Sequence, residues 1–128
     1  MGLTTLQMEI QVILDALRTV RTPAVPGEYD LHAEVSAALM RAGVGHCHEY
    51  RLAPRCRIDF LAGRVGIEIK KGRPVPSALR AQLDRYLASD DLAAVVVVTQ
   101  RAVNLPRTIH GKPVELVSLN RLWGVALP

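Results

Sequence analysis

The sequence predicts an α/β domain with a mixed central β-sheet flanked by helices, and three observations lead to this fold class. Apolar residues recur every three or four positions in some segments and alternate or run continuously in others, which indicates helices interspersed with strands. The chain has 128 residues, about half of them apolar, so it has the size of one domain and can bury a core without disulfides. No internal repeat or low-complexity tract interrupts the pattern.

The first predicted element is an amphipathic helix over residues 3–20. Its apolar positions, spaced as one face of a helix requires, are Leu6, Ile10, Ile13, Leu14, Leu17 and Val20. Pro23, Pro26 and Gly27 mark a linker after it. Residues 1–27 are therefore expected to form a helix and linker in front of a core at 28–128. The helix either pads that core or forms a dimer interface, and the sequence leaves both alternatives open.

The remaining elements are predicted from periodicity and from helix-breaking residues. They are, in order, a helix over 30–42, strands over 46–52, 57–61 and 64–70, a helix over 77–89, and strands over 92–99 and 114–119. Asp30 suits an N-cap, and Pro74 and Pro76 favour a helix start. Ala62-Gly63 predicts a tight hairpin. The continuous apolar run at 92–99 is typical of a central strand covered on both faces.

Composition excludes several classes of protein. The longest apolar run, 92–98, has seven residues, whereas a membrane span needs about 20, so no membrane-spanning protein is expected. The N-terminus lacks the basic and apolar regions of a secretory signal. Cys47 and Cys56 do not make a disulfide framework, and a reducing cytoplasm is expected. His46 and His48 share a strand face, but with scattered thiols they fall short of a zinc site.

The net charge of +4 is concentrated in the middle of the chain. Residues 51–86 contain nine Lys or Arg against three Asp or Glu, a sum of +6. A local basic field of this kind is what a polyanion binder needs, because neutralising phosphates releases counterions. An ordinary solvated basic surface would have the same composition, so charge alone leaves both interpretations open.

Charged residues occur within the predicted strands at 57–61 and 64–70. Alternation puts Ile58 and Phe60 on one face and Asp59 on the other, while Glu68 and Lys70 share a face beside Gly66. Buried charges are costly unless they are paired or bind a metal. The alternative is a solvent-facing sheet surface with cross-strand ion pairs.

Polar residues of two predicted helices point to the same place. Glu34 falls at the edge of an apolar helical stripe, where its carboxylate is expected to face the sheet. Gln82 and Tyr86 are four residues apart on the inward side of the 77–89 helix. Together with Asp59, Glu68 and Lys70 these side chains are expected to converge.

These motifs resemble those of a known family. Asp59, followed after eight residues by Glu68-Ile69-Lys70, is similar to the signature of the PD-(D/E)XK nuclease superfamily, whose members have the restriction-endonuclease-like fold. Gln82-Leu83-Asp84-Arg85-Tyr86 resembles the QxxxY motif of its RecB-like branch, and Arg57-Ile58-Asp59 resembles the RID strand of that branch. Glu34 resembles the family's additional helical acidic residue, whereas Ile58 stands where the founding motif has proline. The resemblance covers about residues 28–119 and implies an α-β-β-β-α-β core with an extra N-terminal helix.

What the resemblance implies is a Mg²⁺-dependent deoxyribonuclease in which Mn²⁺ can replace Mg²⁺. The implied metal ligands are Asp59, Glu68, the backbone carbonyl of Ile69, and Glu34. The implied catalytic residues are Asp59, Glu68, Lys70, Glu34, Gln82 and Tyr86. Lys70 would position water and balance charge, and Gln82 and Tyr86 would orient Lys70, the metal shell or the substrate. Candidate phosphate contacts around these motifs are Arg55, Arg57, Lys71, Arg73, Arg80 and Arg85.

The function expected from the sequence is hydrolysis of DNA phosphodiester bonds in the cytoplasm, with RNA as a possible substrate and a homodimer as a possible assembly. A non-catalytic nucleic-acid-binding or assembly domain on the same fold is the first alternative. The second is an unrelated interaction module whose charges form a surface ion-pair ladder. Intact Asp59, Glu68 and Lys70 favour catalysis over the first alternative, and stabilisation by a divalent metal would exclude the second.

Overall fold

The structure is a computed structural model, and it describes residues 2–20 and 30–119. This part of the chain forms three helices and six strands. They are α1 (Thr5–Leu17), α2 (Asp30–Arg41), β1 (Cys47–Ala53), β2 (Cys56–Ala62), β3 (Val65–Lys70), α3 (Pro76–Leu87), β4 (Ala94–Thr99), β5 (Thr108–Ile109) and β6 (Lys112–Ser118). Within the described residues, no helix is long and apolar enough to cross a membrane.

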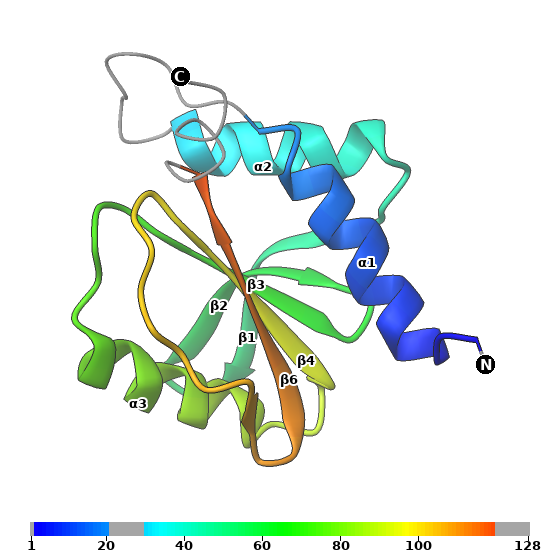
Figure 1. Ribbon diagram of the computed structural model, residues 1–128. Coiled ribbons are helices and arrows are strands. Elements are labelled where there is room, and N and C mark those ends of the chain that lie inside the picture. The colour runs from blue at the N-terminus through cyan, green and yellow to red at the C-terminus, as the bar shows by residue number, and fades with distance from the viewer. Residues whose placement is uncertain (1, 21–29, 120–128) are drawn as a thin grey trace.

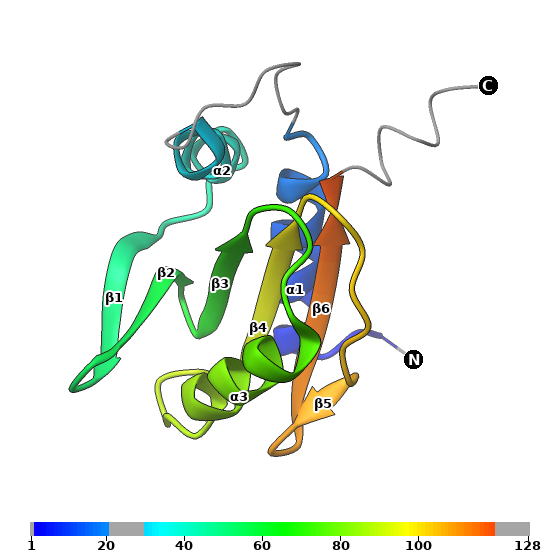
Figure 2. The same cartoon turned by 90° about the vertical axis from the view of Figure 1, so that its left-hand side faces the viewer.

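The strands form one mixed sheet in the order β1-β2-β3-β4-β6-β5. β1, β2 and β3 pair antiparallel, β3, β4 and β6 pair parallel, and β5 is antiparallel to β6. Helices α1 and α2 lie on one side of the sheet and α3 on the other (Figures 1 and 2). The predicted α/β class with a mixed central sheet is therefore confirmed.

The core has one layer on each face of the sheet. All six residues of β4 are buried, as its uninterrupted apolar run predicts. On one face, α1 contributes Ile10, Ile13, Leu14, Ala16 and Leu17 to a cluster that includes α2 and the sheet. Helix α1 therefore pads the core, which is the first of the two roles that the sequence left open.

Element boundaries agree with the sequence predictions to within three residues, except for β5, which was not predicted. Strand β5 falls between the strands predicted over 92–99 and 114–119, where it pairs with the start of β6. His110 and Gly111, with φ of 54° and 71°, form the turn between these strands. Positive φ at both central residues is typical of a tight hairpin whose twist matches that of its strands. Periodicity missed β5 because two residues are too few to show alternation.

Candidate active site

Strands β2 and β3 separate at the two carboxylates. Their register runs from Ala62 opposite Val65 to Phe60 opposite Ile67, and no further pair follows. Beyond it, carboxylate side chains bridge the strands. The N–H of Ile69 donates to Asp59 Oδ2 at 2.8 Å, and the N–H of Asp59 donates to Glu68 Oε1 at 3.3 Å. The sequence therefore folds Asp59 and Glu68 into contact at the point where the strands part.

The alternation of β2 breaks at Asp59, which corrects the expectation that Ile58 and Phe60 share a face. Phe60 packs in the core on the α1 and α2 side, whereas Ile58 packs in the core on the α3 side. Ile58 occupies the space over Gly66, because a Cβ at Gly66 would collide with its Cδ1 atom. Gly66 thus makes room for Ile58 and not for the charged cluster, and the turn of β2 aims the Asp59 backbone at β3.

Lys70 completes a charged cluster with the two carboxylates. Its Nζ lies 3.2 Å from Glu68 Oε2, and its side chain is 30% exposed while that of Glu68 is 5% exposed. Burial, and next the negative charge of Asp59, raise the pKa of Glu68 to about 7, although Lys70 acts in the opposite direction. Two carboxylates and one ammonium leave the ionised cluster with a net negative charge.

A backbone carbonyl also faces the gap between the strands. In a strand, the N–H and C=O of one residue point to the same side. Because the N–H of Ile69 donates to Asp59, the carbonyl of Ile69 lies on the β2 side as well. Its side chain is buried among the apolar residues of the α1 and α2 face. Ile69 can therefore present a third oxygen to the space between Asp59 and Glu68.

Gln82 and Tyr86 act on the backbone of β2. Gln82 Nε2 donates to the Tyr86 hydroxyl at 2.7 Å, and this hydroxyl donates to the carbonyl oxygen of Arg57 at 3.1 Å. Burial, with the nearby Glu68 carboxylate, holds the pKa of Tyr86 well above its usual range, so the phenol stays neutral. The two residues were expected to orient Lys70, the metal shell or the substrate. The contacts fix the strand two residues before Asp59, and the Tyr86 hydroxyl also interacts with the Glu68 side chain.

Glu34 does not join the cluster. Leu31, Val35, Ala38 and Leu39 of α2 are the residues buried against the sheet. Glu34, one position before Val35, has an exposed side chain, so a position at the edge of the buried stripe faces solvent here and not the sheet. Among the described residues, no group of three His, Cys, Asp or Glu side chains could hold a metal ion. A direct role of Glu34 beside Asp59 and Glu68 is therefore not supported by its position.

The six candidate phosphate contacts all have exposed side chains. Arg55 and Arg57 lie at the hairpin of β1 and β2, Lys71 and Arg73 follow β3, and Arg80 and Arg85 lie on α3. These segments flank the cluster in the chain, and α3 lies on the sheet face that carries Tyr86.

Two hydroxyl groups that the sequence did not single out lie in line with Lys70. Thr99 is the register partner of Lys70 on β4, and Ser118 is the partner of Thr99 on β6. Both side chains are buried, and their hydroxyls lack a hydrogen-bond partner within the described part of the chain. Their only signal in the sequence is that each is a polar residue near the end of an apolar strand.

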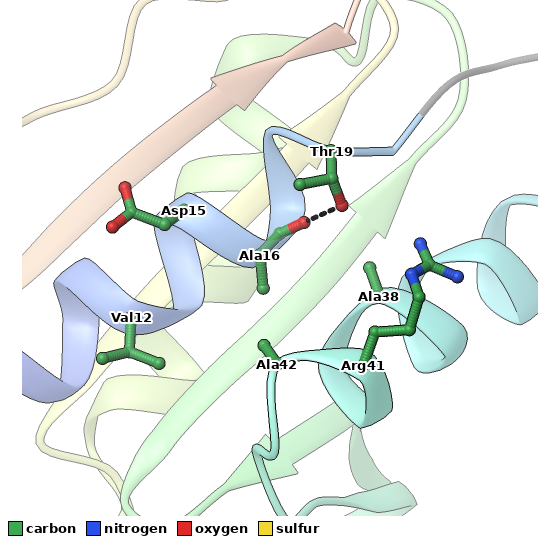
Figure 3. Close-up of a pocket in the computed structure, with 7 residues that line it drawn as sticks. All are labelled: Val12, Asp15, Ala16, Thr19, Ala38, Arg41 and Ala42. Carbon is green, nitrogen blue, oxygen red and sulfur yellow. Dashed lines mark hydrogen bonds between the residues drawn. The ribbon is translucent and has the colours of Figure 1, made fainter.

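A hollow of about 360 Å³ lies between α1 and α2, on the face of the sheet opposite α3 (Figure 3). It is lined by Val12, Asp15, Ala16, Thr19, Ala38, Arg41 and Ala42, and the Thr19 hydroxyl within it donates to the Ala16 carbonyl at 2.7 Å. Val12 is 47% exposed and Met8 is 50% exposed. Pairing of two copies through this face of α1 stays a prediction.

Comparison with known proteins produced no match: neither a protein-family model nor a curated protein nor a solved structure is significantly similar to this chain.

Proposed function

We propose that the protein is a metal-dependent nuclease that hydrolyses DNA phosphodiester bonds on a restriction-endonuclease-like core. The observation that supports this proposal best is the contact of Asp59, Glu68 and Lys70 where β2 and β3 separate. The basic excess of residues 51–86 supports a polyanionic substrate. The two free cysteines agree with a reducing compartment, and we propose that the enzyme acts in the cytoplasm.

The cluster fits a hard divalent cation. Carboxylate and carbonyl oxygens are the ligands that Mg²⁺ prefers, and Mg²⁺ usually keeps several waters. The raised pKa of Glu68 reflects two carboxylates held together at a buried position, where a cation is favoured. We therefore propose Asp59, Glu68 and the Ile69 carbonyl as ligands of Mg²⁺ or Mn²⁺, and we leave Glu34 outside this set.

When bound, the metal would supply positive charge beside the phosphate and lower the pKa of water. The protein's own groups do the rest. Lys70 is anchored to Glu68 and partly exposed, so its ammonium can donate to the scissile phosphate or to the attacking water. Such a donor stabilises the charge that develops on the phosphate oxygens. Tyr86 and Gln82 hold the β2 backbone and thereby keep Asp59 opposite Ile69.

Cleavage of labelled oligonucleotides tests the proposal. Single-stranded, duplex and branched DNA and single-stranded RNA are incubated with the protein in Mg²⁺, in Mn²⁺ and in EDTA. We expect metal-dependent cleavage of DNA, and we expect Glu68→Gln and Lys70→Met each to lower kcat/KM by about a hundredfold or more. Asp90→Asn is the matched control, because Asp90 is exposed after the end of α3, and it should cleave as the wild type does.

Two outcomes would contradict the proposal. Equal cleavage by the wild type and both variants would remove the site assignment while leaving nuclease activity. DNA binding without cleavage in any metal would instead favour the non-catalytic alternative. Cleavage of RNA in preference to DNA would correct the substrate class.

A further inference from the structure

Three histidines gather around one buried phenylalanine on the sheet face opposite α3. His32 comes from α2, and His46 and His48 come from the segment entering β1. Their ring centroids lie 5.9, 5.6 and 4.7 Å from that of Phe60. Phe60 belongs to the core on the α1 and α2 side, whereas Tyr86 and the motif on α3 lie on the other side. The histidine cluster is therefore separate from the candidate active site.

His46 is already fully engaged. Its Nδ1 lies 3.0 Å from the carbonyl oxygen of Val44, and its Nε2 lies 2.8 Å from the Ser36 hydroxyl. A carbonyl can only accept, so Nδ1 carries a proton, and in the neutral ring Nε2 accepts from Ser36. Both nitrogens are used, so the sequential pair His46 and His48 does not form a chelate.

A different pair of histidines, His32 and His48, brings one ring nitrogen of each together. His32 Nδ1 and His48 Nε2 lie 3.3 Å apart, with their rings at 62° to each other. This contact is a hydrogen bond, in which one ring nitrogen donates and the other accepts according to the tautomers. Zinc bound tetrahedrally at about 2.0–2.1 Å from each imidazole places two ligand nitrogens about 3.3 Å apart. The 3.3 Å separation therefore matches that of two nitrogens bound to one ion, once the proton between them has moved to another ring nitrogen or to water.

We propose that His32 and His48 form a binding site for a borderline divalent cation, namely Zn²⁺, Ni²⁺ or Cu²⁺, that joins α2 to the edge strand β1. Imidazole selects these ions over Mg²⁺. Among the described residues no third His, Cys, Asp or Glu completes a ligand group, and water can fill coordination positions that the two imidazoles leave open. His48 is exposed and His32 partly so, which gives a hydrated ion access.

The pair is already held in place before a metal arrives. His48 stacks on Phe60, and Phe60 is fully buried. His32 lies on a helix whose neighbouring Leu31 and Val35 are buried. Metal binding therefore requires little further ordering of these two side chains, and it should stabilise the fold because the ion binds the folded state.

Calorimetric titration of the full chain with ZnCl₂ in excess Mg²⁺ tests the site, because Mg²⁺ occupies oxygen-ligand sites without competing for imidazole. We expect one Zn²⁺ per chain, a rise of Tm with Zn²⁺, and a loss of affinity of about tenfold or more in both His32→Ala and His48→Ala. His110→Ala is the matched control, since His110 pairs with Asp84 at 3.0 Å beside α3, and it should bind Zn²⁺ as the wild type does. Cu²⁺ electron paramagnetic resonance should show two coordinated nitrogens in the wild type.

His32→Gln and His48→Gln, checked by circular dichroism, provide a second pair of variants should an alanine variant fail to fold. The proposal is overturned if the wild type binds no Zn²⁺, or if both His32 and His48 variants bind it with unchanged affinity. An equal loss in His110→Ala would likewise overturn it, because the ion would then sit elsewhere. These measurements use no DNA cleavage, so they are independent of the proposed nuclease activity.

Discussion

Tyr86 donates its hydroxyl to the carbonyl oxygen of Arg57 at 3.1 Å and accepts from Gln82 at 2.7 Å. This chain of hydrogen bonds joins α3 to β2 immediately before Asp59, and all of it is lost when the hydroxyl is removed. We expect Tyr86→Phe to lower the free energy of unfolding by about 1–3 kcal/mol, because a part-buried carbonyl loses its donor and Gln82 loses its acceptor. Urea denaturation measures this loss.

The matched control for Tyr86→Phe is Tyr50→Phe. The hydroxyl of Tyr50 donates to the exposed Asp91 at 3.1 Å, where water can replace it. This variant should change stability by less than about 1 kcal/mol. Equal losses in the two variants would contradict the role that we assign to Tyr86.

Glu68 should make stability depend on pH in the absence of divalent metal. Burial and the charge of Asp59 raise its pKa from 4.5 to about 7 in the folded state. The folded protein therefore holds this proton more tightly than the unfolded chain does. Its contribution to stability is complete below pH about 4.5 and is lost as the pH rises to about 7.

Glu68→Gln cannot titrate, so it should avoid this loss. Each unit of pKa shift corresponds to about 1.4 kcal/mol. The difference in unfolding free energy between Glu68→Gln and the wild type should therefore increase in favour of the variant as the pH rises from 4.5 to about 7. Urea denaturation in EDTA at several pH values measures it, and parallel curves would contradict the raised pKa.

At pH 8, divalent metal should make the wild type more stable than Glu68→Gln, which is the reverse of the order expected in EDTA. If Asp59, Glu68 and the Ile69 carbonyl are ligands, Mn²⁺ binds the folded wild type and not the unfolded chain, which raises its Tm. Glu68→Gln removes a charged ligand and should show little Tm change with Mn²⁺. The comparison requires thermal melts in Mn²⁺ and in EDTA. A Tm of the wild type that is unchanged by Mn²⁺ would remove support for the metal site.

Gly66 and Ile58 should be energetically coupled. A Cβ at residue 66 would meet the Cδ1 atom of Ile58 and lie 3.1 and 3.2 Å from the two Cδ atoms of Leu92. Overpacking of this kind costs about 1–3 kcal/mol, so Gly66→Ala should be destabilised. Ile58→Val removes Cδ1 and should recover part of that loss in the double variant, whereas alone it costs about 0.5–1.5 kcal/mol. Strictly additive effects in this double-mutant cycle would show that the two residues are not in contact.

DNA affinity should depend on salt through the arginines of α3. For duplex DNA, each phosphate contact contributes about 0.9 to the slope of log affinity against log salt. We expect Arg80→Ala with Arg85→Ala to reduce this slope by up to about two units, as measured by fluorescence anisotropy in the presence of Ca²⁺. The control is Arg41→Ala, because exposed Arg41 lies on α2, on the opposite side of the sheet. A slope that falls equally in the control would show that the contacts are not on α3.

The sequence by itself determined the order of the elements and the proximity of the charged motifs. Helical and strand periodicities are local properties of the sequence. All the described helices and strands except β5 could therefore be predicted from them. Asp59 lies on β2, and Glu68 and Lys70 lie on β3. They come together because these two short strands are joined by a tight turn and pair side by side. The helical spacing of Gln82 and Tyr86 brings their side chains into contact.

Only the tertiary structure decided how each element is rotated. Periodicity gives the apolar stripe of α2, which the structure buries, but packing against the sheet decides whether a residue at the edge of that stripe is covered, and Glu34 is left exposed. Ile58 packs on the α3 side, opposite to Phe60, in space that a Cβ at Gly66 would fill. Likewise, His32 meets His48 across sixteen residues of sequence only because both pack against Phe60. Contacts between distant segments are set by shape complementarity in the core, which local sequence patterns do not contain.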